Sequence, residues 1–159
     1  MACLAGGLFR GVGTVIASMP TNIQSCSRFR PMPLIMVNGT DDPLVPYMGG
    51  RVGFRGGRGE VRGVEQTAKL FAAKNDCRDR TERPVADRSI LDGTTVTRVT
   101  WSKCRRAKNV MLYRIEGGGH QIPGGRTILR LLLGRTNHDI SAADAILSAF
   151  AREDARTGE

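Results

Sequence analysis

The sequence contains few of the residues that bind metal ions. Among its 159 residues there are two histidines and four cysteines, and no two cysteines form a Cys-x-x-Cys pair. Protein zinc sites use closely spaced cysteine and histidine ligands. We therefore expect no metal site, and no other motif in the chain indicates a cofactor.

Long apolar runs are also missing. No stretch of 18 or more apolar residues occurs, so no transmembrane helix and no membrane partner are expected. Residues 1–20 are largely apolar, but Arg10 lies in the middle of them rather than ahead of them. A signal peptide has its positive charge first. We predict instead the end of a helix, a turn at residues 10–13 and a buried strand.

Positive charge exceeds negative charge, with 24 Lys and Arg against 15 Asp and Glu. An anionic partner is therefore permitted, and residues 49–63 contain seven glycines and four arginines. This segment is long enough to be a lid or a binding loop. A basic Arg/Gly-rich nucleic-acid-binding module is the alternative function. Because Phe54 is the one aromatic residue in the segment and the arginines are spread along the chain, a solvated basic surface is favoured.

Three apolar runs, each bounded by Gly, Pro or Asn, are typical of strands buried on both faces of a parallel sheet. They are residues 12–18, 33–38 and 110–116. Alternating polarity over residues 95–101 predicts a half-exposed strand.

Two amphipathic helices complete the pattern. Val61, Val64, Ala68 and Phe71 recur at helical spacing and predict a helix over residues 61–74. Ile140, Ala143, Leu147 and Phe150 predict a second helix, which Ser141 and Asp144 could cap. The order of elements predicts one α/β domain over residues 1–159.

Chemically active residues follow two of the predicted strands. Asp41, Asp42 and Pro43 come after residues 33–38, and three glycines followed by His120 come after residues 110–116. Sites in α/β sheets form at the carboxyl ends of strands, and histidine is the usual general base. The Asp-Asp-Pro segment alone is equally compatible with a simple turn. An acid followed by a later histidine matches the chain order of α/β-hydrolases.

The nucleophile of such an enzyme should come first, in a Gly-x-Ser-x-Gly turn between a strand and a helix. None of the seven serines is flanked by glycines at that spacing. Ser18 ends a predicted strand but has no adjacent glycine. The pattern therefore predicts no nucleophile in this chain.

Several collinear segments resemble the polyhydroxybutyrate depolymerase and feruloyl-esterase-like family of α/β-hydrolases. They are residues 39–47, 49–50, 64–67, 75–77, 92–94, 104, 113–120, 123–125 and 136–150. The resemblance implies a three-layer αβα sandwich with a mainly parallel sheet, of which the chain is the C-terminal part. It also implies an ester substrate, and a secreted or periplasmic location for the intact family.

The resemblance assigns the triad acid to Asp42 rather than Asp41, and the triad base to His120 rather than His138. Met1, Ala2 and Cys3 resemble the residues that follow the family's serine, so we expect a chain that is truncated after the nucleophile and inactive alone. Its uncovered sheet edge is expected to self-associate. A separately encoded N-terminal half is a further alternative.

Three other expectations rest on the same resemblance. By position alone, Cys77 and Cys104 could be a disulfide or two buried thiols, and the resemblance favours the disulfide. Many members have histidine at Asn38 and an aromatic residue at Ile122. Ile122 is expected to line the substrate site, which leaves the type of ester open.

Overall fold

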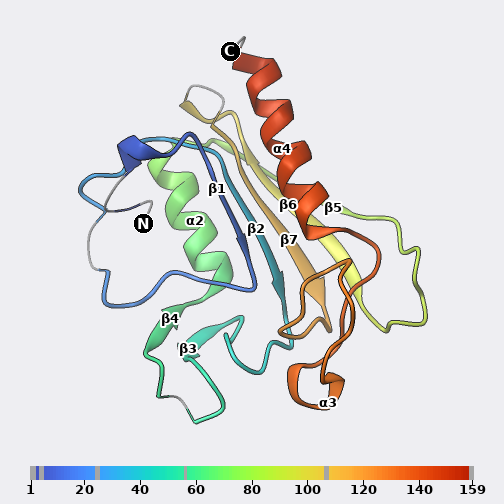
Figure 1. The fold of residues 1–159 in the computed structure, drawn as a ribbon. Coiled ribbons are helices and arrows are strands. Elements are labelled where there is room, and N and C mark those ends of the chain that lie inside the picture. Colours follow the sequence, from blue (N-terminus) through green and yellow to red (C-terminus); the bar gives the residue numbers. More distant parts are fainter. Residues whose placement is uncertain (1–2, 4–5, 24–25, 56, 106–107, 158–159) are drawn as a thin grey trace.

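The fold is a mixed five-stranded sheet with helices on both faces (Figure 1). The computed structural model describes residues 3, 6–23, 26–55, 57–105 and 108–157. In spatial order the strands are β1 (Val12–Val15), β2 (Leu34–Gly39), β7 (Val110–Glu116), β6 (Thr95–Ser102) and β5 (Asp79–Pro84). Within the described ranges, no helix has the length and apolar character that a membrane crossing requires.

The sheet is mixed, with two parallel and two antiparallel pairings, so the expectation of a mainly parallel sheet is confirmed only in part. Strands β1, β2 and β7 are parallel, β6 is antiparallel to β7, and β5 is antiparallel to β6 and so runs in the same direction as β7. A parallel connection needs a crossover of about a dozen residues or more. Only residues 103–109 separate β6 from β7, and a link that short joins antiparallel neighbours.

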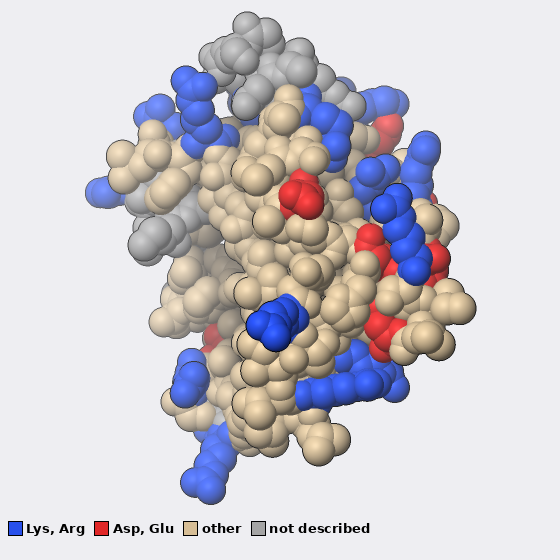
Figure 2. All heavy atoms as spheres, turned by 45° about the vertical axis from the view of Figure 1, so that its right-hand side comes forward, with Lys and Arg blue, Asp and Glu red and all other residues tan. Residues whose placement is uncertain are grey.

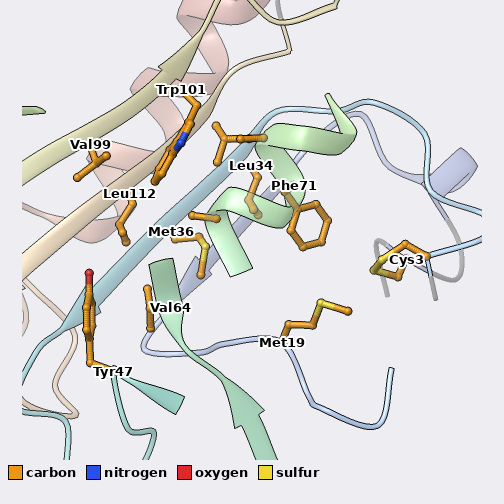
Figure 3. Packing of buried hydrophobic residues seen from close by; sticks show 14 residues of the cluster. Cys3, Met19, Leu34, Met36, Tyr47, Val64, Phe71, Val99, Trp101 and Leu112 are labelled. Carbon is orange, nitrogen blue, oxygen red and sulfur yellow. A yellow bond between two sulfur atoms is a disulfide. The ribbon is translucent and has the colours of Figure 1, made fainter. Parts of the chain in front are cut away.

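Strand β2 lies at the centre of the packing and is buried at every position. Leu34 and Met36 face helix α2 (Val64–Lys74), as Figure 3 shows. Ile35 and Val37 face the opposite layer, which contains helix α4 (Ala142–Thr157). This two-sided burial confirms the interpretation of the apolar run and explains why it shows no alternation.

The helix predicted over residues 61–74 begins three residues later. Residues 60–62 form strand β4 (Glu60–Arg62), which pairs with β3 (Gly49–Arg51). Gly63 has extended backbone angles (φ −55°, ψ 146°) and precedes the helix. The predicted loop over residues 49–63 is therefore a hairpin, and Val61 is buried in it rather than on the helix.

Helix α4 matches the predicted face only in part, since Ile140 and Phe150 pack against the core whereas Ala143 and Leu147 are exposed. Ser141 Oγ accepts a hydrogen bond from the Asp144 N–H (3.3 Å), which confirms the N-terminal cap. The buried residues include Ala142 and Ala149, whereas Leu147 is 66% exposed. Ile146 and Phe150 pack against the same cluster as these two alanines, with part of their surface exposed.

Other boundaries also differ from the predictions. Strand β1 ends at Val15 rather than residue 18, since Ile16 has a left-handed φ of 49°. The sequence did not predict strand β5 or helix α3 (Arg130–Leu133). Among the described residues of the N-terminal segment, Cys3 is helical and Gly6–Leu8 form a 3-10 turn, η1. Met1 and Ala2, which supported the truncation hypothesis, lie outside the described residues.

Two disulfides join segments that lie far apart in the sequence. Cys77, after α2, pairs with Cys104, after β6, as the resemblance implied. The Cys3–Cys26 disulfide was not predicted. It links the segments that lead into β1 and β2. Two disulfides are consistent with an oxidising extracellular environment.

Candidate functional site

The structure brings Asp42 and His120 together at one edge of the sheet. Strands β2 and β7 are parallel neighbours, so their carboxyl ends lie side by side. Asp42 follows β2 by three residues and His120 follows β7 by four. Asp42 Oδ2 lies 2.8 Å from His120 Nδ1, which is hydrogen-bond distance.

Backbone hydrogen bonds fix the Asp42 carboxylate independently of its contact with the imidazole. Its Oδ1 accepts the backbone N–H groups of Leu44 and Val45, both at 2.8 Å. This is the local turn that an aspartate side chain commonly makes. The side chain of Asp42 is 1% exposed and that of His120 is 25% exposed. The carboxylate is therefore fixed and buried, while the ring stays accessible from outside.

The neighbouring candidates have different surroundings. Asp41 is exposed and accepts a hydrogen bond from the Thr40 hydroxyl at 3.1 Å. His138 is also exposed, and its backbone N–H donates to the carboxylate of Asp92 at 2.8 Å. Neither of these side chains contacts the Asp42–His120 pair through a described hydrogen bond.

Glycines allow the two loops to meet. A Cβ atom on Gly39 would lie closer than 3.0 Å to three backbone atoms of Gly118 and Gly119. Gly118 in turn accepts the Asp41 N–H at 2.9 Å. The glycines before His120 thus provide backbone contact between the loops as well as freedom to turn.

Gln121 is a site residue that the sequence reasoning missed. It is 6% exposed, and its amide donates to the carbonyl groups of Ile128 and Gly134 and accepts the Ile128 N–H. These bonds cross-link the loop that follows His120. A buried polar residue beside a candidate histidine could have been suspected from sequence, but its partners could not.

A cluster of charged residues lies on the α2 side of the sheet. Arg114 is paired with Glu65 (3.0 Å), Glu82 (3.4 Å) and Glu116. Burial would lower the pKa of Arg114, but its hydrogen bonds to Glu116 and Glu65 raise it above its usual range. Burial and nearby Glu65 raise the pKa of Tyr47. Neither Arg114 nor Tyr47 can exchange a proton easily near neutral pH. The cluster therefore serves to join α2 to the sheet rather than to transfer protons.

No described serine hydroxyl hydrogen-bonds to His120. The Ser18 hydroxyl donates to the carbonyl of Arg62 at 2.7 Å and lies 3.0 Å from the Thr67 hydroxyl. All four cysteines are in disulfides. Among the described residues, no three His, Cys, Asp or Glu side chains are placed to hold a metal ion. Ile122, two residues after His120, is 60% exposed.

The arginines of the hairpin lie in different environments. Arg51, Arg55 and Arg58 are exposed, and Arg62 is partly buried. Phe54 is 64% exposed. On the face drawn in Figure 2, basic side chains are scattered over the surface rather than gathered in one patch. The nucleic-acid alternative stays a hypothesis.

The two edges of the sheet differ in chemistry. Edge strand β5 has charged and exposed residues, including Arg80 and Glu82, and ends in Pro84. Such residues protect an edge from pairing with another strand. Strand β1, at the other edge, has the sequence Val-Gly-Thr-Val and no charge. Among the described residues, no strand pairs with its outer side.

An apolar groove of about 450 Å³ lies next to β1 on the α2 side. Val12, Thr14, Met19 and Phe71 contribute to its walls, together with Cys3. In Figure 3, Cys3 and Met19 lie beyond Phe71, at the end of the core cluster. The open edge of β1 therefore lies beside an apolar groove.

The chain is similar to one part of a longer curated protein. That protein is "Putative esterase NocK" from Nocardia uniformis subsp. tsuyamanensis, which is 25% identical over 145 residues. The match covers 86% of this chain and 42% of the relative, so the chain spans less than half of that protein's length. No model of a known protein family matches the chain, and neither does any solved structure.

Proposed function

We propose that this chain is part of a serine-type carboxylic ester hydrolase with an α/β-hydrolase fold, and that it contributes the acid and the histidine of the catalytic triad. The observation that carries this proposal is the 2.8 Å contact between His120 Nδ1 and the buried carboxylate of Asp42. The similarity to an esterase supports it. So do the two parallel strands that end at the pair.

The mechanism assigns a separate role to each member of the pair. His120 Nε2 would take the proton from a serine hydroxyl as the serine attacks the ester carbonyl, and would then donate it to the leaving alcohol. Asp42 would keep the proton of the neutral ring on Nδ1 and stabilise the imidazolium that forms. Water would then release the acyl group by the reverse sequence of proton transfers.

The serine is proposed to come from residues that are not in this sequence, within a Gly-x-Ser-x-Gly turn. That turn would also supply one backbone N–H of the oxyanion hole. Losing a triad nucleophile costs on the order of 10⁶ in rate. We therefore propose that the chain is inactive by itself.

The finer assignment is to polyhydroxybutyrate depolymerases and feruloyl or acetyl esterases. Their acid segment resembles residues 39–47 and 49–50, and their histidine segment resembles residues 113–120 and 123–125. Ile122 is proposed to contact the substrate because it is 60% exposed and lies two residues after His120. A secreted or periplasmic location is proposed on the basis of the two disulfides.

The test compares this 159-residue chain with a version extended upstream through a Gly-x-Ser-x-Gly turn. We expect no hydrolysis of short-chain p-nitrophenyl esters by the chain alone. The extended protein should hydrolyse them, His120→Ala should abolish that activity, and His138→Ala should preserve it. Turnover by the chain alone that His120→Ala removes would contradict the proposed division of the triad.

We further propose that the outer edge of β1 is a pairing surface, through which the isolated chain self-associates. The N–H groups of Val12 and Ile16 bond to Pro33 and Val37, on the β2 side. Since alternate residues of a strand face opposite neighbours, the N–H of Val15 points outward. Val15→Pro removes this donor from the outer edge only.

Sedimentation velocity over a range of concentrations tests this surface. The wild-type chain should form dimers or larger species, Val15→Ala should behave in the same way, and Val15→Pro should shift the population towards monomer. Self-association that is unchanged in Val15→Pro would place the contact elsewhere on the molecule.

A further inference from the structure

The loop that follows His120 exposes a continuous apolar surface. Residues 126–132 are all exposed, and their apolar members are Ile128, Leu129, Leu131 and Leu132. Leu131 is fully exposed and the other three are 54–63% exposed. Exposed patches of large aliphatic side chains mark interaction surfaces in soluble proteins.

The base of this loop is closed by backbone hydrogen bonds. The N–H of His120 donates to Leu133 at 2.6 Å, and the N–H of Gly119 donates to Arg135 at 2.9 Å. A Cβ atom on Gly119 would lie closer than 3.0 Å to atoms of Leu133 and Gly134. The loop thus leaves the sheet at His120 and returns next to it.

The interior of the loop is also fixed. Buried Gln121 bonds to both backbone groups of Ile128 and to the carbonyl of Gly134. Leu129 has a left-handed φ of 48°, a conformation that is costly for a leucine and persists only where the surroundings impose it. The apolar side chains are therefore held outward, and Figure 1 shows α3 projecting beyond the carboxyl ends of β2 and β7.

The charge of the loop indicates an anionic partner. Between residues 117 and 138 there are three arginines, Arg126, Arg130 and Arg135, and no acidic residue. All three arginines are exposed. Aliphatic side chains flanked by arginines match a lipid–water interface, where the apolar residues insert and the cations meet anionic headgroups.

Two other partners fit less well. A second copy of the chain would place two loops with three positive charges each against one another, which repel. A single-stranded nucleic acid is bound by aromatic side chains that stack on its bases, and residues 121–135 contain none.

We propose that residues 121–135 dock on the surface of an anionic lipid bilayer, with Ile122 and the four exposed aliphatic residues of 126–132 inserted. This peripheral contact departs from the expectation of no membrane partner, which rested on the lack of a transmembrane run. The proposal does not depend on ester hydrolysis, because lipid binding is measured without a substrate. Docking would bring His120 to the interface where water-insoluble esters collect.

The experiment is co-sedimentation of the 159-residue chain with vesicles of phosphatidylcholine and phosphatidylglycerol in equal parts. We expect binding to these vesicles that salt weakens, and much weaker binding to pure phosphatidylcholine. Leu131→Ser with Leu132→Ser should lower the partition coefficient about tenfold or more for each leucine inserted. Arg126→Gln with Arg130→Gln should lower it roughly fivefold per arginine.

Matched variants elsewhere on the surface serve as controls. Leu147→Ser on α4 and the pair Arg83→Gln and Arg152→Gln also remove exposed side chains, and both should bind vesicles like the wild type. Thermal unfolding verifies that every variant is folded. Equal losses in the loop variants and the controls, or no binding at all, would overturn the proposal. Two other outcomes would also overturn it. One is binding of single-stranded RNA without binding of vesicles, and the other is a dimer that Leu131→Ser dissociates, again without binding of vesicles.

Discussion

Asp42 accepts or shares three hydrogen bonds, and substitutions can distinguish their contributions to stability. Asp42→Ala leaves the N–H groups of Leu44 and Val45 and the Nδ1 of His120 without their acceptor. Each lost bond costs about 1 kcal/mol when the donor cannot fully reach water. The sum is about 3 kcal/mol, which lowers Tm by roughly 6–12 °C in a protein of this size.

Asp42→Asn has a different expected effect. The amide oxygen can still accept the N–H groups of Leu44 and Val45, so most of the stability remains and the loss is about 1 kcal/mol. The amide nitrogen then faces His120 Nδ1, and two donors cannot bond to each other. The neutral ring must therefore move its proton from Nδ1 to Nε2, the wrong tautomer for a general base.

Thermal unfolding combined with ¹⁵N NMR of the imidazole tests both effects. Asp41→Ala is the matched control, since the Asp41 side chain is exposed and accepts a hydrogen bond from its neighbour Thr40, while its backbone bond to Gly118 survives the substitution. It should change neither Tm nor the tautomer of His120. The reasoning is refuted if Asp42→Ala destabilises no more than Asp41→Ala, or if His120 keeps one tautomer in the wild type and in Asp42→Asn.

Three further predictions concern the scaffold. Gly39→Ala should cost about 3 kcal/mol or more in guanidinium unfolding, because its Cβ would overlap fixed backbone atoms, whereas Gly57→Ala has nothing within 4 Å and should be nearly neutral. Replacing Cys77 and Cys104 by serine opens a loop of 27 residues and should cost about 3–4 kcal/mol in the same assay. The Asp92 carboxylate loses solvation by burial, but hydrogen bonds to it outweigh this and lower its pKa. Its stabilisation is therefore complete above the ordinary aspartate pKa of about 4 and is lost as pH falls through the lower folded pKa. Asp92→Asn should be less stable than the wild type at neutral pH, and their unfolding curves should converge in acid.

Those parts of the structure that depend on buried apolar runs could be predicted from the sequence. Residues 33–38 and 110–116 are apolar because they are buried in the sheet, and the approach of Asp42 to His120 follows from two parallel strands that end side by side. The pattern of apolar residues was informative because the polarity of each residue matched its own burial in the sheet.

Where a neighbour determines the structure, the sequence was a poor guide. Strand β5 is polar and almost wholly exposed, and it exists through pairing with β6. On α4, Ala142 and Ala149 are buried against the sheet whereas the larger Leu147 is exposed. Neither the partner strand nor the space between layers can be read from a local pattern.

Gly11, directly before β1, and Gly13 within it have a consequence for the alignment of this strand with β2. Cβ atoms on Gly11 and Gly13 would lie within 3.0 Å of Phe150 and Ile146 of α4. If the strand slipped by two residues along its neighbour, Phe9 or Val15 would have to occupy one of these narrow positions. An edge strand with only one partner is otherwise prone to such slippage. Here Phe150 and Ile146 of α4 favour the observed register of β1, because a side chain in either position would have to displace them.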